Sequence, residues 1–538
     1  MKLLFLARHA NYFRNFESVI RLWAERGHQV HLAVERGETV GGSALLDQLT
    51  AAYAGVTAGE APRREAGEWA SMAARLRRAV DLLRYLEPAY DATPRLRVRA
   101  AERAPAFAVA FAASMWSRSG VVRSALGWAL RRAEAAIPLS RDVSAYLREQ
   151  HPDALVMTPL IGVVGSSQPD YLGAARAAGV PVAVAVWSWD HLTSKALIRQ
   201  APDRVLVWND VQRNEAVRLH GIAADRVVVT GAQCFDQWFG RRPSRTRAEF
   251  CAAVGLPDEK PFLLYVGSAL FAGSPPEAGF VQQWIAAIRT SADPALRSCA
   301  ILVRPHPQRM REWEGVDLSG FGDVSVWGSN PVTDQARVDY FDSLAYSRAV
   351  IGLNTSAFLE AAIAGRPVLA ILPDEFRDNQ EGTLHFGYLS TVGGGLLRTS
   401  RTLVEHCAQL SQVLAAPDDR VGHDAFIGAF LRPHGLEVPA TPVFADAVQT
   451  LAAQSQSHAS QQPAATVASA SGRWLLGLLG RMSRSRRFGS WFFDEEERRA
   501  RAWRGEKAEE RAAHRRANLD PDARAEAEKT MRSKRTAS

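Results

Sequence analysis

A run of polar residues near position 355 combines the side chains that an anion site needs. Asn354, Thr355 and Ser356 follow the apolar stretch 349–351, and all three residue types commonly precede the first turn of a helix. Amide groups at a helix start lack partners within the helix, and together with hydroxyls they bind anions such as phosphate. Glu360 lies four residues after Ser356, on the same helical face, where it could accept hydrogen bonds from a ribose diol. A capped helix with a surface glutamate is the alternative interpretation.

A second polar group also follows apolar runs. The string VWSWDHLTSK places Asp190 and His191 directly after a run typical of a strand, and His9 follows the first apolar run, LLFLA. A carboxylate and two imidazoles in loops at strand ends are candidates for proton transfer.

Strands and helices that alternate along the chain must position these residues. One series of short apolar runs separated by helical or loop segments ends near residue 232, and a second begins at PFLLYVGS, residues 261–268. Such a pattern predicts parallel sheets covered by helices. The predicted fold class is therefore α/β, with two doubly wound, Rossmann-like domains whose strand ends can face one cleft.

The composition changes along the chain define the expected domains. We expect an N-terminal domain at 1–234, with an Ala/Arg/Leu-rich helical insertion at about 41–150, and a C-terminal domain at 235–457. A Gln/Ser/Ala-rich linker at 458–472 precedes a basic tail at 473–538, which is either disordered or bound at a membrane surface.

Charge and composition exclude several classes of protein. The 538 residues are 47% hydrophobic and carry 65 Lys and Arg against 57 Asp and Glu, as in a globular protein. The four cysteines are scattered, which argues against a zinc site, and no P-loop or early Gly-x-Gly-x-x-Gly string occurs in the body of the chain, which argues against an ATPase or a dehydrogenase, so no cofactor is expected. No apolar run is long enough to span a bilayer, which predicts a cytoplasmic protein. The basic tail and the Arg-rich segment 62–149 are candidates for an anionic membrane surface, while nucleic acid is an unlikely partner.

Two strings in the second half resemble a known superfamily. NTSAFLEAAIAGRPVLAI, from Asn354, resembles the nucleotide-binding segment of glycosyltransferases with the GT-B fold, and RPHPQ, from Arg304, is similar to an element of CDP-glycerol glycerophosphotransferase-like and capsule Kdo-transferase-like members. The N-terminal string LARHANYFRNFESVIRLWAERGHQVHLAV is similar to the first strand, acceptor-side loop and turn of the same enzymes. The segment 41–150 and the tail match nothing comparable.

The resemblance implies roles for particular residues. Ser268 would bind diphosphate, Arg304 would be a phosphate ligand, and His306 would donate to the leaving phosphate, beside the segment from Asn354 to Glu360. Asp190 would be the general base for an acceptor hydroxyl, with His191 and His9 as neighbours and rivals for that role.

The implied function is transfer of a sugar, or a polyol phosphate, from a nucleotide-activated donor to a surface polysaccharide or lipid-linked acceptor, without a metal. The alternatives are a nucleotide-sugar 2-epimerase of the same fold and a catalytically inactive, membrane-associated binding protein. We expect the enzyme at the inner face of the cell membrane.

Overall fold

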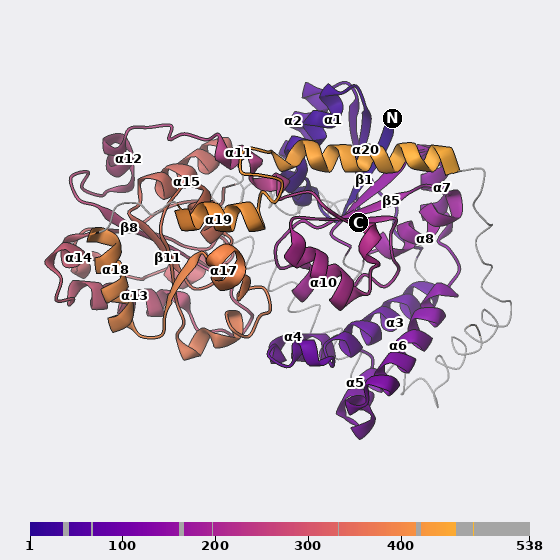
Figure 1. Cartoon of the computed structure of the whole chain (residues 1–538), viewed down its shortest axis with the longest axis horizontal. Coiled ribbons are helices and arrows are strands. Elements are labelled where there is room, and N and C mark those ends of the chain that lie inside the picture. The colour runs from indigo at the N-terminus through magenta and orange to yellow at the C-terminus, as the bar shows by residue number, and fades with distance from the viewer. Residues whose placement is uncertain are drawn as a thin grey trace, which may run out of the picture. The chain divides into compact units, whose positions relative to one another are not determined.

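The computed structural model divides the chain into two compact units, each built on a parallel sheet. It describes residues 1–35, 42–65, 68–160, 166–195, 197–331, 333–415, 421–458 and 477. Among these residues, unit 1 comprises Met1–Gly240, Glu381–Leu396 and 421–458, and unit 2 comprises Arg241–Gln380 and 397–415. The predicted α/β class is confirmed (Figure 1).

Unit 1 contains a seven-stranded sheet in the order β3-β2-β1-β4-β5-β6-β7. All adjacent strands are parallel. The strands are β1 (Lys2–Ala7), β2 (Gln29–Val34), β3 (Val56–Glu60), β4 (Ala154–Thr158), β5 (Val182–Ala185), β6 (Arg204–Val207) and β7 (Val227–Val229).

Helices cover both faces of this sheet. In β1, Leu3 and Phe5 enter one hydrophobic core while Leu4 and Leu6 enter the other, as side chains that alternate along a strand require. The α-helices are α1 (Glu17–Glu25), α2 (Gly42–Ala52), α3 (Glu68–Arg84), α4 (Pro94–Ala101), α5 (Ala106–Ala113), α6 (Gly120–Ala135), α7 (Arg141–Gln150), α8 (Gln168–Ala178), α9 (His191–Ser194), α10 (Asp210–His220), α11 (Asp236–Phe239), α17 (Tyr388–Thr391), α19 (Val421–Phe430) and α20 (Ala440–His458). The 3-10 helices are η1 (Ala10–Phe16), η2 (Pro88–Tyr90), η3 (Met115–Arg118), η4 (Ala224–Arg226), η5 (Gln233–Phe235) and η9 (Val392–Gly394).

Unit 2 contains a six-stranded parallel sheet in the order β10-β9-β8-β11-β12-β13. Its strands are β8 (Phe262–Val266), β9 (Ala300–Arg304), β10 (Val324–Val326), β11 (Ala349–Gly352), β12 (Val368–Ile371) and β13 (Leu397–Ser400). Its helices are α12 (Arg247–Val254), α13 (Glu277–Arg289), α14 (Pro294–Ser298), α15 (Asp334–Tyr346), α16 (Ala357–Ile363), α18 (Leu403–Ala415), η6 (Met310–Trp313), η7 (Ser319–Phe321) and η8 (Asp374–Asn379).

Several domain assignments differ from those expected, and residues 381–396 and α19, which were expected in the second domain, belong to unit 1. β3 lies inside the segment assigned to the helical insertion, so the insertion proper begins at α3. Unit 1 extends to Gly240 rather than 234. Helix α20 was assigned to the second domain, but it packs on α1, where Phe444 and Val448 join the core of unit 1 with Trp23 (Figure 1). The linker and tail at 459–538, apart from Gly477, lie outside the described residues.

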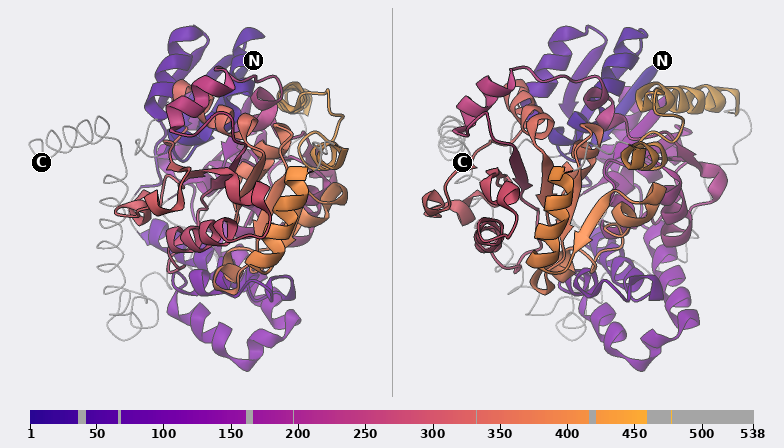
Figure 2. Two further views of the ribbon diagram at one scale, coloured as in Figure 1. Left: turned by 90° about the vertical axis from the view of Figure 1, so that its left-hand side faces the viewer. Right: turned by 60° about the vertical axis from the view of Figure 1, so that its left-hand side comes forward.

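The insertion forms a separate helical layer of unit 1. α3 packs on α4, α5 and α6 around its own small core, and these purple helices lie at the opposite end of the unit from the N-terminal strand (Figure 2). No helix among the described residues is long and apolar enough to cross a membrane.

A buried chain of alternating charges fixes the insertion to the sheet layer. Arg77 of α3 pairs with Glu134 of α6 at 2.7 Å and with Asp170 of α8 at 3.0 Å. We call the whole set the ion chain; in order it runs Arg64, Asp170, Arg77, Glu134, Arg199, Asp81. Three cations alternate with three anions, so the chain has no net charge, as buried ions require.

Candidate functional site

The strand order of unit 2 creates a ligand position between β8 and β11. The chain runs outward from β8 to one sheet edge, through β9 and β10, and then returns to place β11 on the other side of β8. Ligands of doubly wound sheets bind at such a switch point, beyond the carboxyl ends of the strands. Ser268 follows β8 and Asn354 follows β11, and the Asn354 amide donates to Ser268 Oγ at 3.1 Å. The structure therefore brings these two predicted site residues into contact.

Ser268 is fixed by hydrogen bonds within unit 2. It is fully buried, and its amide donates to Glu277 Oε2 at 2.8 Å. The Tyr265 hydroxyl donates to the other oxygen of Glu277 at 3.0 Å, and burial raises the pKa of Glu277 to about 7. The Ser268 hydroxyl accepts a hydrogen bond from the Asn354 amide, so Ser268 positions the loop that follows β11. Direct contact between Ser268 and a diphosphate stays a prediction.

Asn354 carries an acceptor that the described residues leave unused. Its Nδ2 donates to the Asn379 carbonyl at 2.5 Å. Its Oδ1 is buried and has no hydrogen-bond partner among the described residues. A buried acceptor without a donor is costly, so this oxygen is a candidate to bind a donor group of a ligand.

The start of α16 differs from the expected anion site. The Ala357 amide donates to Thr355 Oγ1 at 3.3 Å, while Ser356, at the N-cap position, makes no capping bond with its side chain. The next two amides, of Phe358 and Leu359, are bonded to the carbonyls of Thr355 and Ser356. The expectation that these amides are unpaired was wrong, because a tight turn at Thr355 uses them.

Arg304 is held between two aromatic rings at the end of β9. Its guanidinium carbon lies 5.2 Å from the ring centroids of both Trp327 and Tyr340. Its Nη2 donates to the Ser329 carbonyl at 3.5 Å, but its Nη1 has no partner among the described residues. Burial lowers the pKa of Arg304 to about 10, which still leaves it cationic at neutral pH. A buried guanidinium with an unused N–H is suited to bind phosphate.

Tyr340 links Arg304 to Glu360 and was not predicted. The Tyr340 hydroxyl donates to Glu360 Oε2, while its ring contacts Arg304. Arg304, Tyr340 and Glu360 therefore form one line of contacts across β9, α15 and α16. Tyr340 lies within helix α15, away from any strand end, so nothing in the sequence distinguished it.

His306 is a neutral hydrogen-bond donor. The Gln308 amide donates to His306 Nδ1 at 3.2 Å, which assigns the ring proton to Nε2. Burial lowers the pKa of His306 to about 4, so the imidazole is uncharged at neutral pH. A Cβ on Gly267 would lie 2.6 Å from the His306 backbone nitrogen. Gly267 therefore allows the His306 loop to approach the end of β8.

In unit 1, a row of aromatic contacts connects His9 to His191, two of the three residues predicted as candidates for the general base. His9 follows β1 and stacks on Tyr12 with centroids 6.3 Å apart. Tyr12 meets Trp187 edge-on at 5.0 Å, and Trp187 lies 6.4 Å from His191. Asp190 directly precedes His191, so both ends of the row lie at the carboxyl edge of the sheet.

Asp190 is a fixed, ionised carboxylate. Ser188 Oγ donates to its Oδ1 at 2.6 Å, and Lys195 Nζ lies 2.9 Å from its Oδ2. Burial would raise the pKa of Asp190, but Lys195 and His385 outweigh it and hold the pKa well below its ordinary value. A carboxylate so stabilised is a weaker base than the sequence led us to expect.

His191 is enclosed in the protein. Only 1% of its surface is exposed, and neither ring nitrogen has a hydrogen-bond partner among the described residues. Burial lowers its pKa to about 3, so the ring is neutral. The neutral His191 ring has one N–H that can donate a hydrogen bond and one nitrogen that can accept one. It is not a cation at neutral pH.

His385 and Lys195 complete this cluster and were missed. His385 Nδ1 lies 3.3 Å from Thr193 Oγ1, and its ring meets Trp189 edge-on at 4.7 Å. Burial lowers the pKa of His385 to about 4. The sequence could have indicated Lys195, because it is a cation five residues after Asp190. His385 lies 192 positions after Thr193, so no local pattern indicates that the two are in contact.

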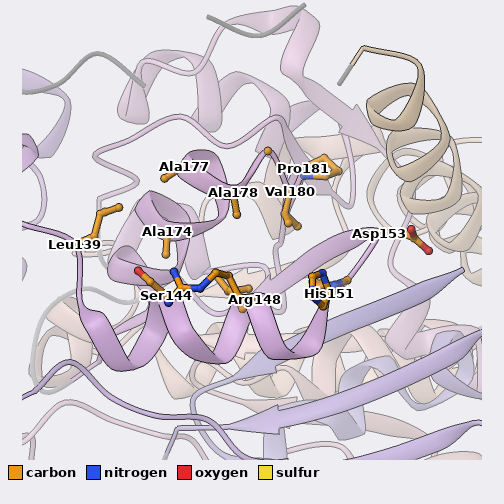
Figure 3. A pocket seen from close by; sticks show the side chains of 13 residues that line it. Leu139, Ser144, Arg148, His151, Asp153, Ala174, Ala177, Ala178, Val180 and Pro181 are labelled. Atoms are coloured by element: carbon orange, nitrogen blue, oxygen red, sulfur yellow. The ribbon is translucent and has the colours of Figure 1, made fainter. Parts of the chain in front are cut away.

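A surface hollow of about 560 Å³ lies at the other edge of the unit 1 sheet. Ser144 and Arg148 of α7 face Ala174, Ala177 and Ala178 of α8 across it (Figure 3). Residues 152–153 and 180–181, which line it, directly precede β4 and β5. The hollow therefore lies at the amino ends of the strands, away from the predicted site residues. The described residues contain no group of three or more His, Cys, Asp or Glu that could hold a metal ion.

Comparison with known proteins gives distant structural matches. No protein family model matches this sequence, and no curated protein matches it. A glycosyltransferase from Rickettsia africae ESF-5 is similar over 84% of this chain and 98% of its own, with 10% identity and a TM-score of 0.48. The UDP-GlcNAc 2-epimerase from Methanocaldococcus jannaschii is similar over 84% of this chain and 99% of its own, with 10% identity and a TM-score of 0.46. MurG from Acinetobacter baumannii has 14% identity, 84% and 99% coverage and a TM-score of 0.43. Similarity at this level does not extend to substrate or activity.

Proposed function

We propose that this chain is a metal-independent glycosyltransferase-like enzyme that binds its nucleotide-activated donor at the carboxyl edge of the unit 2 sheet. The observation that carries the proposal is the placement of Arg304 and Asn354 at the ends of β9 and β11, on either side of β8. Arg304 is buried and Asn354 is half-buried, and each has one buried polar side-chain atom without a hydrogen-bond partner among the described residues. A cationic hydrogen-bond donor at the end of β9 and a neutral acceptor beside the switch point suit a ligand with a phosphate and an adjacent hydroxyl or amide.

Each residue of the site has a role in this proposal. Arg304 and the Nε2–H of His306 bind the diphosphate and stabilise the charge that develops as it leaves. Glu360, held by Tyr340, accepts hydrogen bonds from the ribose hydroxyls.

The transfer step is a substitution at the anomeric carbon. An acceptor hydroxyl oxygen bonds to that carbon as the bond to the diphosphate oxygen breaks, so the nucleoside diphosphate leaves with the electron pair. The hydroxyl proton passes to a general base, for which we keep Asp190, His191 and His9. The acceptor is a surface polysaccharide or a lipid-linked saccharide.

Thermal unfolding with CDP, CMP, UDP, GDP and ADP tests the donor site. We expect at least one nucleotide to stabilise the protein, by about 2.7 kcal/mol when it is present at one hundred times its Kd. His306→Ala and Glu360→Ala each remove one proposed contact, so each should weaken binding of that nucleotide about tenfold, or about 1.4 kcal/mol. Titration calorimetry measures the change directly.

Glu375→Ala is the matched control, because Glu375 is an exposed carboxylate of η8 in the same unit. It should leave nucleotide affinity unchanged. Normal affinity in both site variants would contradict the proposed donor site. A nucleotide sugar that is converted to a sugar epimer without any acceptor would instead support the epimerase.

A further inference from the structure

The helical insertion exposes an unusual number of large apolar side chains. Eleven such side chains are exposed among the described residues, and six of them lie within 31 consecutive positions: Val98, Val109, Met115, Trp116, Val121 and Trp128. Trp116 is 64% exposed and Trp128 is 63% exposed. Single exposed apolar residues are ordinary on protein surfaces, but a cluster marks a contact site. We call the surface formed by α5, η3 and α6 the apolar tip.

Helix α6 carries two opposite faces. Leu130 and Glu134 are buried on the face toward α3. Val121, Trp128 and Arg132 are spaced seven and four residues apart, so they form a single line on the opposite face. Val121 is 80% exposed, and the Arg132 guanidinium lies 5.9 Å from the Trp128 ring. The outward face of α6 is therefore apolar and cationic together.

Helix α5 adds a wholly apolar segment to the same surface. Its eight residues are AFAVAFAA: Ala108 is buried, Phe107, Phe111 and Ala112 pack against the core of the insertion, and Val109 is exposed. η3 connects it to α6 and contributes Met115, which is 78% exposed. Figure 1 shows α5 at the end of the insertion, farthest from β1 in unit 1.

The charge of this segment is almost entirely positive. Residues 94–133 contain eight arginines and one acid, Glu102, which gives a net charge of +7. Arg97, Arg118, Arg131 and Arg132 are exposed, and none has an ion pair with a described residue. Such cations without acidic neighbours complement an anionic surface.

We propose that the apolar tip binds the surface of an anionic lipid bilayer, with Trp116, Trp128 and Met115 in the interface and the arginines at the lipid headgroups. Tryptophan prefers this interface because it is both apolar and a hydrogen-bond donor. Apolar side chains next to several cations are typical of segments that lie in a membrane interface. The binding is independent of the donor site, since no residue of the tip belongs to it.

Sedimentation of the full chain with vesicles tests the proposal. We expect binding to phosphatidylcholine vesicles with 30% phosphatidylglycerol, and at least tenfold weaker binding to phosphatidylcholine alone. Two variants should each weaken binding to the anionic vesicles at least tenfold: Trp116→Ala with Trp128→Ala, and Arg118→Gln with Arg131→Gln and Arg132→Gln. Nucleotide affinity should be unchanged in both, which separates this proposal from the donor site.

A matched control and a conservative variant show whether a loss of vesicle binding is specific to the apolar tip. Val404→Ala removes an apolar side chain that is 82% exposed on α18 of unit 2, and it should leave vesicle binding unchanged. Trp116→Phe with Trp128→Phe retains apolar rings, so binding should stay within about threefold. Brominated lipids should quench part of the tryptophan fluorescence of the natural chain and less of the Trp128→Phe chain.

Three results would overturn the proposal. The first is equal vesicle binding by the natural chain and by both tip variants. Loss of binding on truncation after Gln462, with no effect of the tip variants, would assign the contact to the tail. A dimer that is broken by Trp116→Ala with Trp128→Ala, without vesicle binding, would assign the tip to a second copy of the chain.

Discussion

Replacing Asp190 with asparagine is expected to slow transfer by about 100-fold while leaving nucleotide affinity in unit 2 unchanged. Asparagine keeps the shape of the side chain but cannot take a proton, and loss of a general base costs roughly this factor. The hydrogen bond from Ser188 can still form to an amide oxygen. Release of nucleotide from the donor, measured in the steady state with saturating acceptor, checks the rate.

Two further variants show whether Asp190 is the base. Lys195 holds the pKa of Asp190 low, so Lys195→Met should raise that pKa. Because the reaction needs the ionised carboxylate, the acid limb of the rate profile should then move to higher pH. A normal rate for Asp190→Asn together with an inactive His9→Ala would assign the base to His9.

Removing the charge of Glu134 should destabilise unit 1 by about 3 kcal/mol. Glu134 lies between Arg77 and Arg199 in the ion chain, at 2.7 and 3.1 Å. Glu134→Gln leaves the buried segment with one uncompensated positive charge, and breaking one partner of a buried ion pair usually costs about 3–5 kcal/mol. Urea unfolding followed by circular dichroism measures the loss.

Two comparisons isolate the effect of burial. Asp210→Asn removes one partner of an exposed pair on α10, whose carboxylate is 76% exposed, and should cost less than about 1 kcal/mol. Arg77→Met with Glu134→Leu leaves two balanced pairs, Arg64 with Asp170 and Arg199 with Asp81. That double variant should be more stable than Glu134→Gln alone, and equal losses for all three would show that charge in the ion chain is unimportant.

The central strands could be predicted from the sequence because they are buried on both faces. QVHLAV, PFLLYVGS and CAILVRP contain β2, β8 and β9, and each is an almost continuous apolar run. The edge strands β3 and β13 were missed. Their sequences, VTAGE and LRTS, are partly exposed and too short and polar to give a signal.

The candidate site was predicted only where it follows a strand. Ser268, Arg304 and Asn354 end buried strands, so the sequence could place them at one sheet edge. Tyr340 and His385 come from elements that reach the site through tertiary packing, and no local pattern indicates such contacts. The tight turn at Thr355 depends on local hydrogen bonds of the Ala357, Phe358 and Leu359 amides that residue types alone do not specify.

The return of α20 to unit 1 has a consequence for the order in which the protein folds during synthesis. The Trp23 indole donates to the Ala445 carbonyl, 422 positions later in the chain. Unit 1 therefore cannot complete its core until residues beyond 445 have left the ribosome, whereas every strand of unit 2 ends by Ser400. Long separations between contacting residues slow folding. Unit 2 should then fold first, and until α20 docks, the nascent first half exposes the sides of Phe16 and Trp23 that later contact Phe444, an apolar surface prone to aggregation.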